Sequence, residues 1–154
     1  MFDPRPPLAL LLALGLDAAA AGPVLWPQTI SLERDCNGCP TGSRLVLHAD
    51  GRAQLATLGK ARLGTEDALR EGRFPIDEFA ALARLARTRG FFDLDDEIAA
   101  PQQQDGPWLL LRIEGADGRA KQVFSRGETP PPALAALLEA LDAAGRHIVF
   151  APPD

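Results

Sequence analysis

Hydrophobic and polar residues alternate along five short segments of the chain, which is the pattern of β-strands that bury one face. The first segment is Thr29 to Glu33, where Ile30 and Leu32 fall on the same side. The other four segments form two pairs, and an Asp-Gly dipeptide, which favours a tight hairpin turn, separates the members of each pair. We therefore predict one leading strand and two hairpins, whose strands are 43–49 with 52–58 and 108–114 with 119–125.

Two further segments repeat apolar residues every three or four positions, the spacing of an amphipathic helix. The first begins at Pro75, which suits a first helical turn, and Gly90 stands where a glycine commonly follows a helix. The second opens at Pro130-Pro131-Pro132 and ends at Gly145. We predict that Leu45, Leu47, Leu109, Leu111 and Ile113 of the hairpins pack against Phe79, Leu82, Leu134, Leu138 and Leu141 of the helices, and that Phe91 and Phe92 fill the core.

The predicted order of elements is β-ββ-α-ββ-α. Hairpins that share an apolar face need a second layer to cover it, and the two helices provide that layer. The segment from Gly59 to Arg73 is rich in Gly, Arg and Glu, and we expect a loop there. The sequence therefore predicts an α+β fold of two layers, an antiparallel sheet of hairpins with two helices on one face.

One short sequence occurs twice. Ala49-Asp50-Gly51-Arg52-Ala53 returns letter for letter as Ala116-Asp117-Gly118-Arg119-Ala120, and each copy leads to a helix that starts with proline. One interpretation is a duplicated unit with a pseudo-symmetric cleft. The other is that Asp-Gly is the most favourable hairpin turn in a chain rich in Ala, Arg, Gly and Leu. The predicted architecture is the same under both interpretations.

The N-terminal segment has the features of an export signal. An unbroken apolar run, Leu8 to Leu16, precedes the small residues Ala18 to Ala21, and cleavage is expected near Ala20 or Ala21. Asp17 ends the run well short of the ~20 apolar residues that a transmembrane helix needs. We predict a signal peptide (1–21), a linker (22–28), one α+β domain (29–150) and a tail (151–154), with a periplasmic or secreted location. The alternative is an apolar N-terminus on a cytosolic protein.

The net charge and the absence of known catalytic motifs argue against several classes of function. Residues 22–154 keep 15 of the 16 Lys and Arg and 19 of the 21 Asp and Glu residues, a net charge of −4, without a basic cluster of the kind that binds nucleic acid. The sequence contains no serine-hydrolase, zinc-protease, phosphate-loop or dinucleotide-binding motif. We therefore expect a monomer that is not an enzyme, has no cofactor, binds no nucleic acid and does not span the membrane after cleavage.

Cys36 and Cys39 are the only cysteines and enclose Asn37-Gly38. In an oxidising compartment two neighbouring thiols are expected to form a disulfide. Closing so small a ring is worth only about 2 kcal/mol, so the bond shapes the loop more than it stabilises the fold. Asn37-Gly38 fits a turn with positive φ at both residues.

Two alternatives for the cysteine pair remain. A catalytic redox pair gains its reactive thiol from a helix N-terminus, whereas here Pro40 and a predicted strand follow the motif. A zinc site would need two more ligands, and His48 and His147 are the only imidazoles. The acidic segment 93–97 lacks the glycine and glutamate of an EF-hand calcium loop, so no metal ligands are assigned.

A family resemblance rests on the cysteine motif and on the order of elements around it. Ile30 to Arg34 leads into Cys36-Asn37-Gly38-Cys39-Pro40, and a strand, an Asp-Gly turn, a helix that starts with proline and a second hairpin follow. Over Gln28 to Ala144 this resembles the small exported bacterial proteins of domain-of-unknown-function family 6438. The resemblance implies the fold and export. That family has no established activity, so Cys36, Gly38, Cys39, Pro40, Asp50 and Gly51 correspond only as signature positions.

Two functional hypotheses follow. The first is an exported binding or structural module that presents the disulfide loop and the loop Ala99 to Pro107 to a protein or small-molecule partner in the cell envelope. Its candidate binding residues are Asn37, Gly38, Pro40, Gln102, Gln103, Gln104 and Asp105. The second is a periplasmic thiol-disulfide protein that acts through Cys36 and Cys39.

Overall fold

The structure of the chain is a computed structural model that describes residues 26–103 and 105–151. The predicted signal peptide, most of the predicted linker and tail, and Gln104 lie outside the described residues. The described residues form an eight-stranded sheet and two α-helices, so the predicted mixed α+β content is confirmed.

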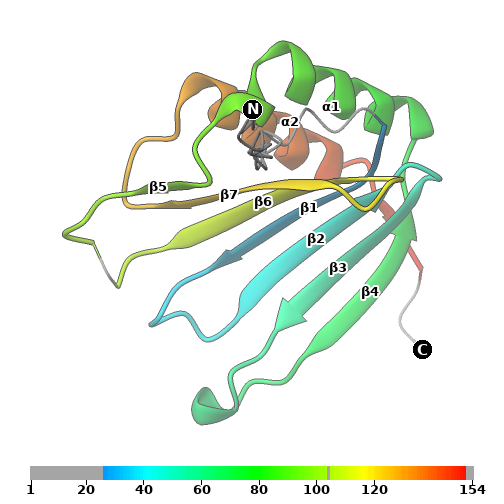
Figure 1. Ribbon diagram of the computed structural model, residues 1–154. Coiled ribbons are helices and arrows are strands. Elements are labelled where there is room, and N and C mark those ends of the chain that lie inside the picture. Colours follow the sequence, from blue (N-terminus) through cyan, green and yellow to red (C-terminus); the bar gives the residue numbers. More distant parts are fainter. Residues whose placement is uncertain (1–25, 104, 152–154) are drawn as a thin grey trace, which may run out of the picture.

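Both helices lie over the same face of the sheet (Figure 1). The strand order is β5-β7-β6-β1-β2-β3-β4-β8, and every neighbouring pair is antiparallel except β5 with β7. The strands are β1 (Pro27–Asp35), β2 (Gly42–His48), β3 (Arg52–Leu58), β4 (Ala68–Arg73), β5 (Glu97–Ala99), β6 (Trp108–Gly115), β7 (Ala120–Arg126) and β8 (Val149–Phe150). The helices are α1 (Ile76–Thr88) and α2 (Pro132–Gly145), and the short 3-10 turns are η1 (Ala61–Leu63) and η2 (Phe91–Asp93).

The strands and helices predicted from periodicity are present, with strand ends within two residues of their predicted positions. Pro75 directly precedes α1 and Pro131 directly precedes α2, because proline has the backbone angle of a helix start and needs no hydrogen-bond partner for its nitrogen. Gly90 has a φ of 79°, a left-handed conformation that glycine adopts most easily after a helix.

The prediction of a loop from Gly59 to Arg73 is wrong over its second half, which forms β4. This strand pairs with β3 at six positions, from Thr57 with Ala68 to Arg52 with Arg73. Most of its side chains are exposed, so the sequence lacks the apolar alternation that marks a half-buried strand. Backbone hydrogen bonds to β3 rather than side-chain burial hold it in the sheet. The outermost strands, β5 and β8, are too short to carry any pattern.

The core lies between the sheet and the helices and contains the residues predicted for it. Leu47, Leu111 and Ile113 are completely buried, and the predicted partners on the helices belong to the same cluster. Each such buried leucine or isoleucine contributes about 1.5–3 kcal/mol through removal of its side chain from water. Phe91 is buried, and Phe92 is partly buried and meets it edge to face. Leu45, Leu109 and Leu138 are partly buried at the margin of this cluster.

The two ends of the sheet differ. At the turn end, two Asp-Gly turns join β2 to β3 and β6 to β7, beneath the helices (Figure 1). At the loop end the strands reach beyond the helices, and three longer loops gather there: the disulfide loop (36–41), the β3–β4 loop (59–67) and the β5–β6 loop (100–107).

Candidate functional site

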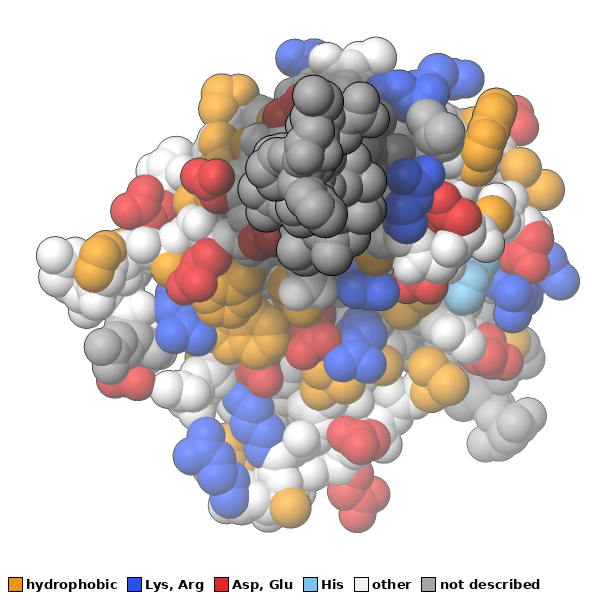
Figure 2. All heavy atoms as spheres, in the orientation of Figure 1, with side chains coloured by type: hydrophobic (Ala, Val, Ile, Leu, Met, Phe, Trp, Pro, Cys, Tyr) orange, Lys and Arg blue, Asp and Glu red, His pale blue; other side chains and the backbone are white. Residues whose placement is uncertain are grey.

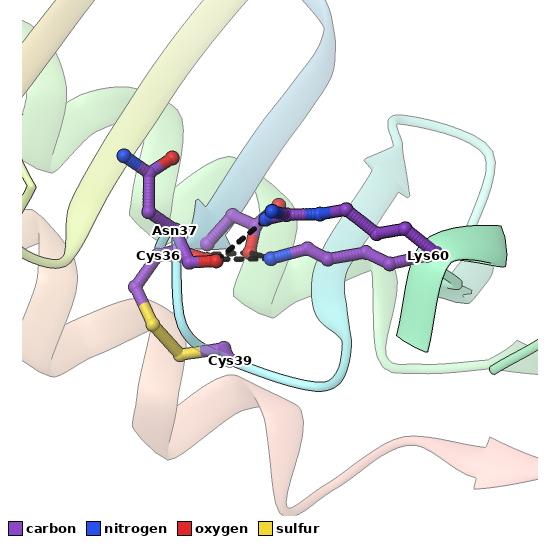
Figure 3. Close-up of a disulfide and its surroundings, with 6 residues drawn as sticks. Cys36, Asn37, Cys39 and Lys60 are labelled. Carbon is purple, nitrogen blue, oxygen red and sulfur yellow. Dashed lines mark hydrogen bonds and ion pairs between the residues drawn. A yellow bond between two sulfur atoms is a disulfide. The ribbon is translucent and has the colours of Figure 1, made fainter. Parts of the chain in front are cut away.

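The disulfide loop joins β1 to β2 at the loop end. Cys36 and Cys39 are bonded, with their Cα atoms 5.2 Å apart, so the predicted disulfide is confirmed (Figure 3). The amide of Cys39 donates a hydrogen bond to the carbonyl of Cys36 at 3.3 Å, which closes a four-residue turn. Neither Asn37 nor Gly38 has a positive φ, so that part of the prediction is wrong: the turn closes with ordinary backbone angles. Both residues are exposed at its tip.

Lys60 of the β3–β4 loop reaches the base of the disulfide loop (Figure 3). Its amino group donates hydrogen bonds to the carboxylate of Asp35, at 2.6 Å, and to the carbonyl of Cys36. The Lys60 and Asp35 side chains are only 14% and 17% exposed, so water screens this ion pair less than it would on an open surface. The hydrogen bond from Lys60 lowers the pKa of Asp35 below its ordinary value, helped by a second bond from the Cys36 amide.

The same loop makes two further contacts with the disulfide loop. The guanidinium of Arg62 donates to the carbonyl of Asn37 at 2.7 Å, and the hydroxyl of Thr65 donates to the carbonyl of Pro40 at 2.6 Å. Three carbonyl oxygens of the disulfide loop therefore accept hydrogen bonds from one neighbouring loop. This matters because a short exposed loop has few backbone partners of its own.

The structure brings together the two loops that the sequence nominated for binding. The side-chain amide of Asn37 donates to the carboxylate of Asp105 at 2.9 Å, across 68 positions of sequence. Gln103 lies against Gly127, where a Cβ atom would come within 2.1 Å of the Gln103 side chain. Gly38, Pro40 and Gln102 are exposed, and Gln104 lies outside the described residues.

A cleft of about 530 Å³ opens beside the disulfide. Its lining comes from the loop ends of β1, β2, β6 and β7 and from the segment that leads into α2. Among the lining residues are Cys39, Thr41, Ser43, Pro107, Leu109, Ser125, Glu128 and Pro130. Sequence reasoning did not nominate this cleft, because its walls come from four separate segments and no motif connects them.

Gly42 allows the close packing between the cleft and the Lys60–Asp35 pair. A Cβ atom at this position would lie 2.9 Å from the Asp35 side chain and 3.1 Å from the carbonyl of Arg34. A larger residue would therefore force the Asp35 side chain, the partner of Lys60, to shift. The glycine at the start of β2 thus leaves room for the Asp35 side chain beside Lys60.

Within 26–103 and 105–151, no three or more His, Cys, Asp and Glu side chains lie together in a way that could hold a metal ion. His147 contacts Glu78 of α1 at 2.7 Å. Neither helix in this part of the chain is long and apolar enough to cross a membrane. Acidic and basic side chains are interspersed over the face seen in Figure 2.

Comparison with known proteins adds no assignment. No protein-family model matches the chain, and no curated protein matches it significantly. The resemblance to family 6438 that the cysteine motif carries is therefore still a hypothesis. The candidate site consists of the three hydrogen-bonded loops of the loop end and the cleft beside the disulfide.

Proposed function

We propose that the protein is a small exported binding module, not an enzyme, that holds a partner in the cell envelope with its loop end. The observation that carries this proposal is the set of hydrogen bonds that join the disulfide loop to both neighbouring loops. Loops that are ordered before binding lose less conformational entropy when a partner arrives. A two-layer domain, with two helices on one face of the sheet, would supply the rigid support for them.

Export is part of the proposal. It rests on the apolar run with its following alanines and on the disulfide, which persists in oxidising compartments. N-terminal sequencing of the protein recovered from a bacterial host tests it. A new N-terminus near Ala21 in the periplasm or medium is expected, and an intact Met1 in the cytosolic fraction would contradict export.

Site-specific photo-crosslinking tests the binding surface. A photoreactive benzoylphenylalanine placed at Gln102, which is exposed on the β5–β6 loop, is expected to form an adduct in the cell envelope. The matched control places the same group at Asp77, which is exposed on α1. In the protein that carries benzoylphenylalanine at position 102, the additional substitution Asn37→Ala should reduce the amount of adduct. This substitution removes the hydrogen bond between Asn37 and Asp105, which joins the two loops. No adduct at Gln102, or an equal one at Asp77, would overturn the proposal.

The thiol-disulfide alternative has one favourable observation. Lys60 and Arg62 place two cations against the backbone of the cysteine motif, and neighbouring cations stabilise a thiolate. This alternative expects reduced protein to show a thiol pKa well below the free value of about 8.5 and to reduce a model disulfide with turnover. Lys60→Met should then raise the thiol pKa. A normal thiol pKa without turnover would leave the disulfide with a structural role only.

A further inference from the structure

Ser125 is a buried polar residue at the cleft. It lies on β7 between Leu109 of β6 and Ile98 of β5, and it is only 4% exposed. Its side chain lines the cleft, and its hydroxyl group has no hydrogen-bond partner among the described residues. The hydroxyl oxygen is not one of the fully buried polar atoms that lack a partner, so it is open to the cleft. A ligand in the cleft would provide a partner.

The charges around the cleft do not cancel. Arg34 is held by two hydrogen bonds to Asp142, at 2.8 and 3.1 Å, and Asp35 is paired with Lys60. Glu128 also lines the cleft, and no cationic side chain among the described residues pairs with it. The cleft therefore presents one uncompensated negative charge to a ligand.

The rest of the lining is mainly apolar. Pro107, Trp108, Leu109 and Pro130 contribute hydrocarbon surface, and Cys39 also lines the cleft. The cleft volume of about 530 Å³ falls in the range of small-molecule sites, which combine an apolar lining with a few polar groups. A ligand that fits needs an apolar body and a polar, positively charged end.

We infer that this cleft binds a small organic ammonium ion, with its apolar body on Leu109 and the two prolines and its polar end toward Glu128 and Ser125. The inference rests on the cleft and does not depend on the loop surface proposed above. The two proposals can fail separately. Crosslinking at Gln102 tests binding by the loops, whereas NMR titration tests binding in the cleft.

NMR titration of the isotope-labelled protein tests the inference with three probes of the same shape. These are 4-phenylbutylamine, which is cationic, 4-phenylbutanol, which is neutral, and 4-phenylbutanoate, which is anionic. The amine is expected to shift the amide signals of Leu109, Ser125 and Glu128 saturably. Its affinity should exceed that of the alcohol by about two- to fivefold, the size of one exposed ion pair. The carboxylate should bind more weakly than the alcohol.

Variants assign the two polar roles. Glu128→Gln should abolish the preference for the amine over the alcohol, whereas Glu139→Gln, a matched change at an exposed residue of α2 outside the cleft lining, should leave it intact. Ser125→Ala should weaken binding of both amine and alcohol while the amide spectrum stays that of the folded protein. Carboxylate binding as tight as the amine, an unaltered preference in Glu128→Gln, or no saturable shift at the cleft would overturn the inference.

Discussion

The two ends of the sheet acquire their structure in different ways. At the turn end, the carboxylates of Asp50 and Asp117 each accept hydrogen bonds from the backbone and the guanidinium of an arginine two positions later. These bonds lower the pKa of both carboxyl groups. At the loop end, the corresponding bonds join residues 24 to 68 positions apart. Five consecutive residues therefore suffice to specify a turn, whereas the contacts of the loop end require the pairing of strands that are distant in the sequence.

The helix layer adds a second difference, since it covers the turn end and leaves part of the loop end open. Leu111 and Leu109 lie on the same strand and the same face. Leu111 is completely buried, and Leu109 is partly buried at the cleft. The turn end is not covered evenly, because of its two identical turns Gly51 is buried against Phe74, whereas Gly118 is open to solvent.

Leucine truncation should show the largest difference between the two ends. Leu111→Ala is expected to lower the free energy of unfolding by about 2–5 kcal/mol, because it leaves a cavity beneath the helices. Leu109→Ala should cost less, since water already reaches its side chain and can fill the space. Urea unfolding of both variants measures this. Equal losses would mean that the cleft is closed in solution.

The two turn glycines give the next comparison. Both have a positive φ, 83° at Gly51 and 77° at Gly118, so alanine should cost about 1 kcal/mol of backbone strain at either position. At Gly51 the new Cβ would also lie 3.1 Å from the carbonyl of Phe74, so this backbone group would have to move. Gly51→Ala should therefore reduce the melting temperature more than Gly118→Ala. Equal decreases in melting temperature would show that the backbone strain of the turn alone determines the loss of stability.

Removal of the disulfide tests how the loop end is held. Replacing both Cys36 and Cys39 by serine should lower stability by no more than about 2 kcal/mol, because the ring is short. The contacts from Lys60, Arg62 and Thr65 are expected to keep the loop in place. Amide exchange of the loop residues measures this directly. Exchange as fast as in an unstructured peptide would show that the covalent bond is the main constraint.

Lys60→Met should have a small effect, about 1 kcal/mol, and that effect should depend on pH. The pKa of Asp35 is lower in the folded state than its ordinary value of 3.8, so the pair stabilises the fold above that pH and loses its contribution as the pH falls through the folded value. The stability difference between wild type and Lys60→Met should therefore shrink in acid. Unfolding across a pH series measures it, and a constant difference would exclude the ion pair as its cause.

Much of the fold could be predicted from the sequence because its signals are local. Alternation in β1, β2, β3, β6 and β7, helical spacing after the prolines, and the Asp-Gly turns each depend on residues a few positions apart. The disulfide was predictable because the chain has only two cysteines. β4 was missed because its exposed side chains carry no pattern, although its backbone pairs fully with β3.

The assembly of the candidate site depends on contacts between segments that are far apart in the sequence. Asn37 and Asp105 were nominated as loop residues, but their mutual contact depends on the pairing of β1 with β6. Nothing in the sequence marked Lys60 or Ser125 as a site residue. A lysine in a loop and a serine in a strand are common, and their roles follow only from their neighbours in the fold. The five patterned strands, the two helices and the disulfide could be read from the chain alone, since they follow from short-range physics. The cleft and its uncompensated charge arise where distant segments meet, and only folding brings those segments together.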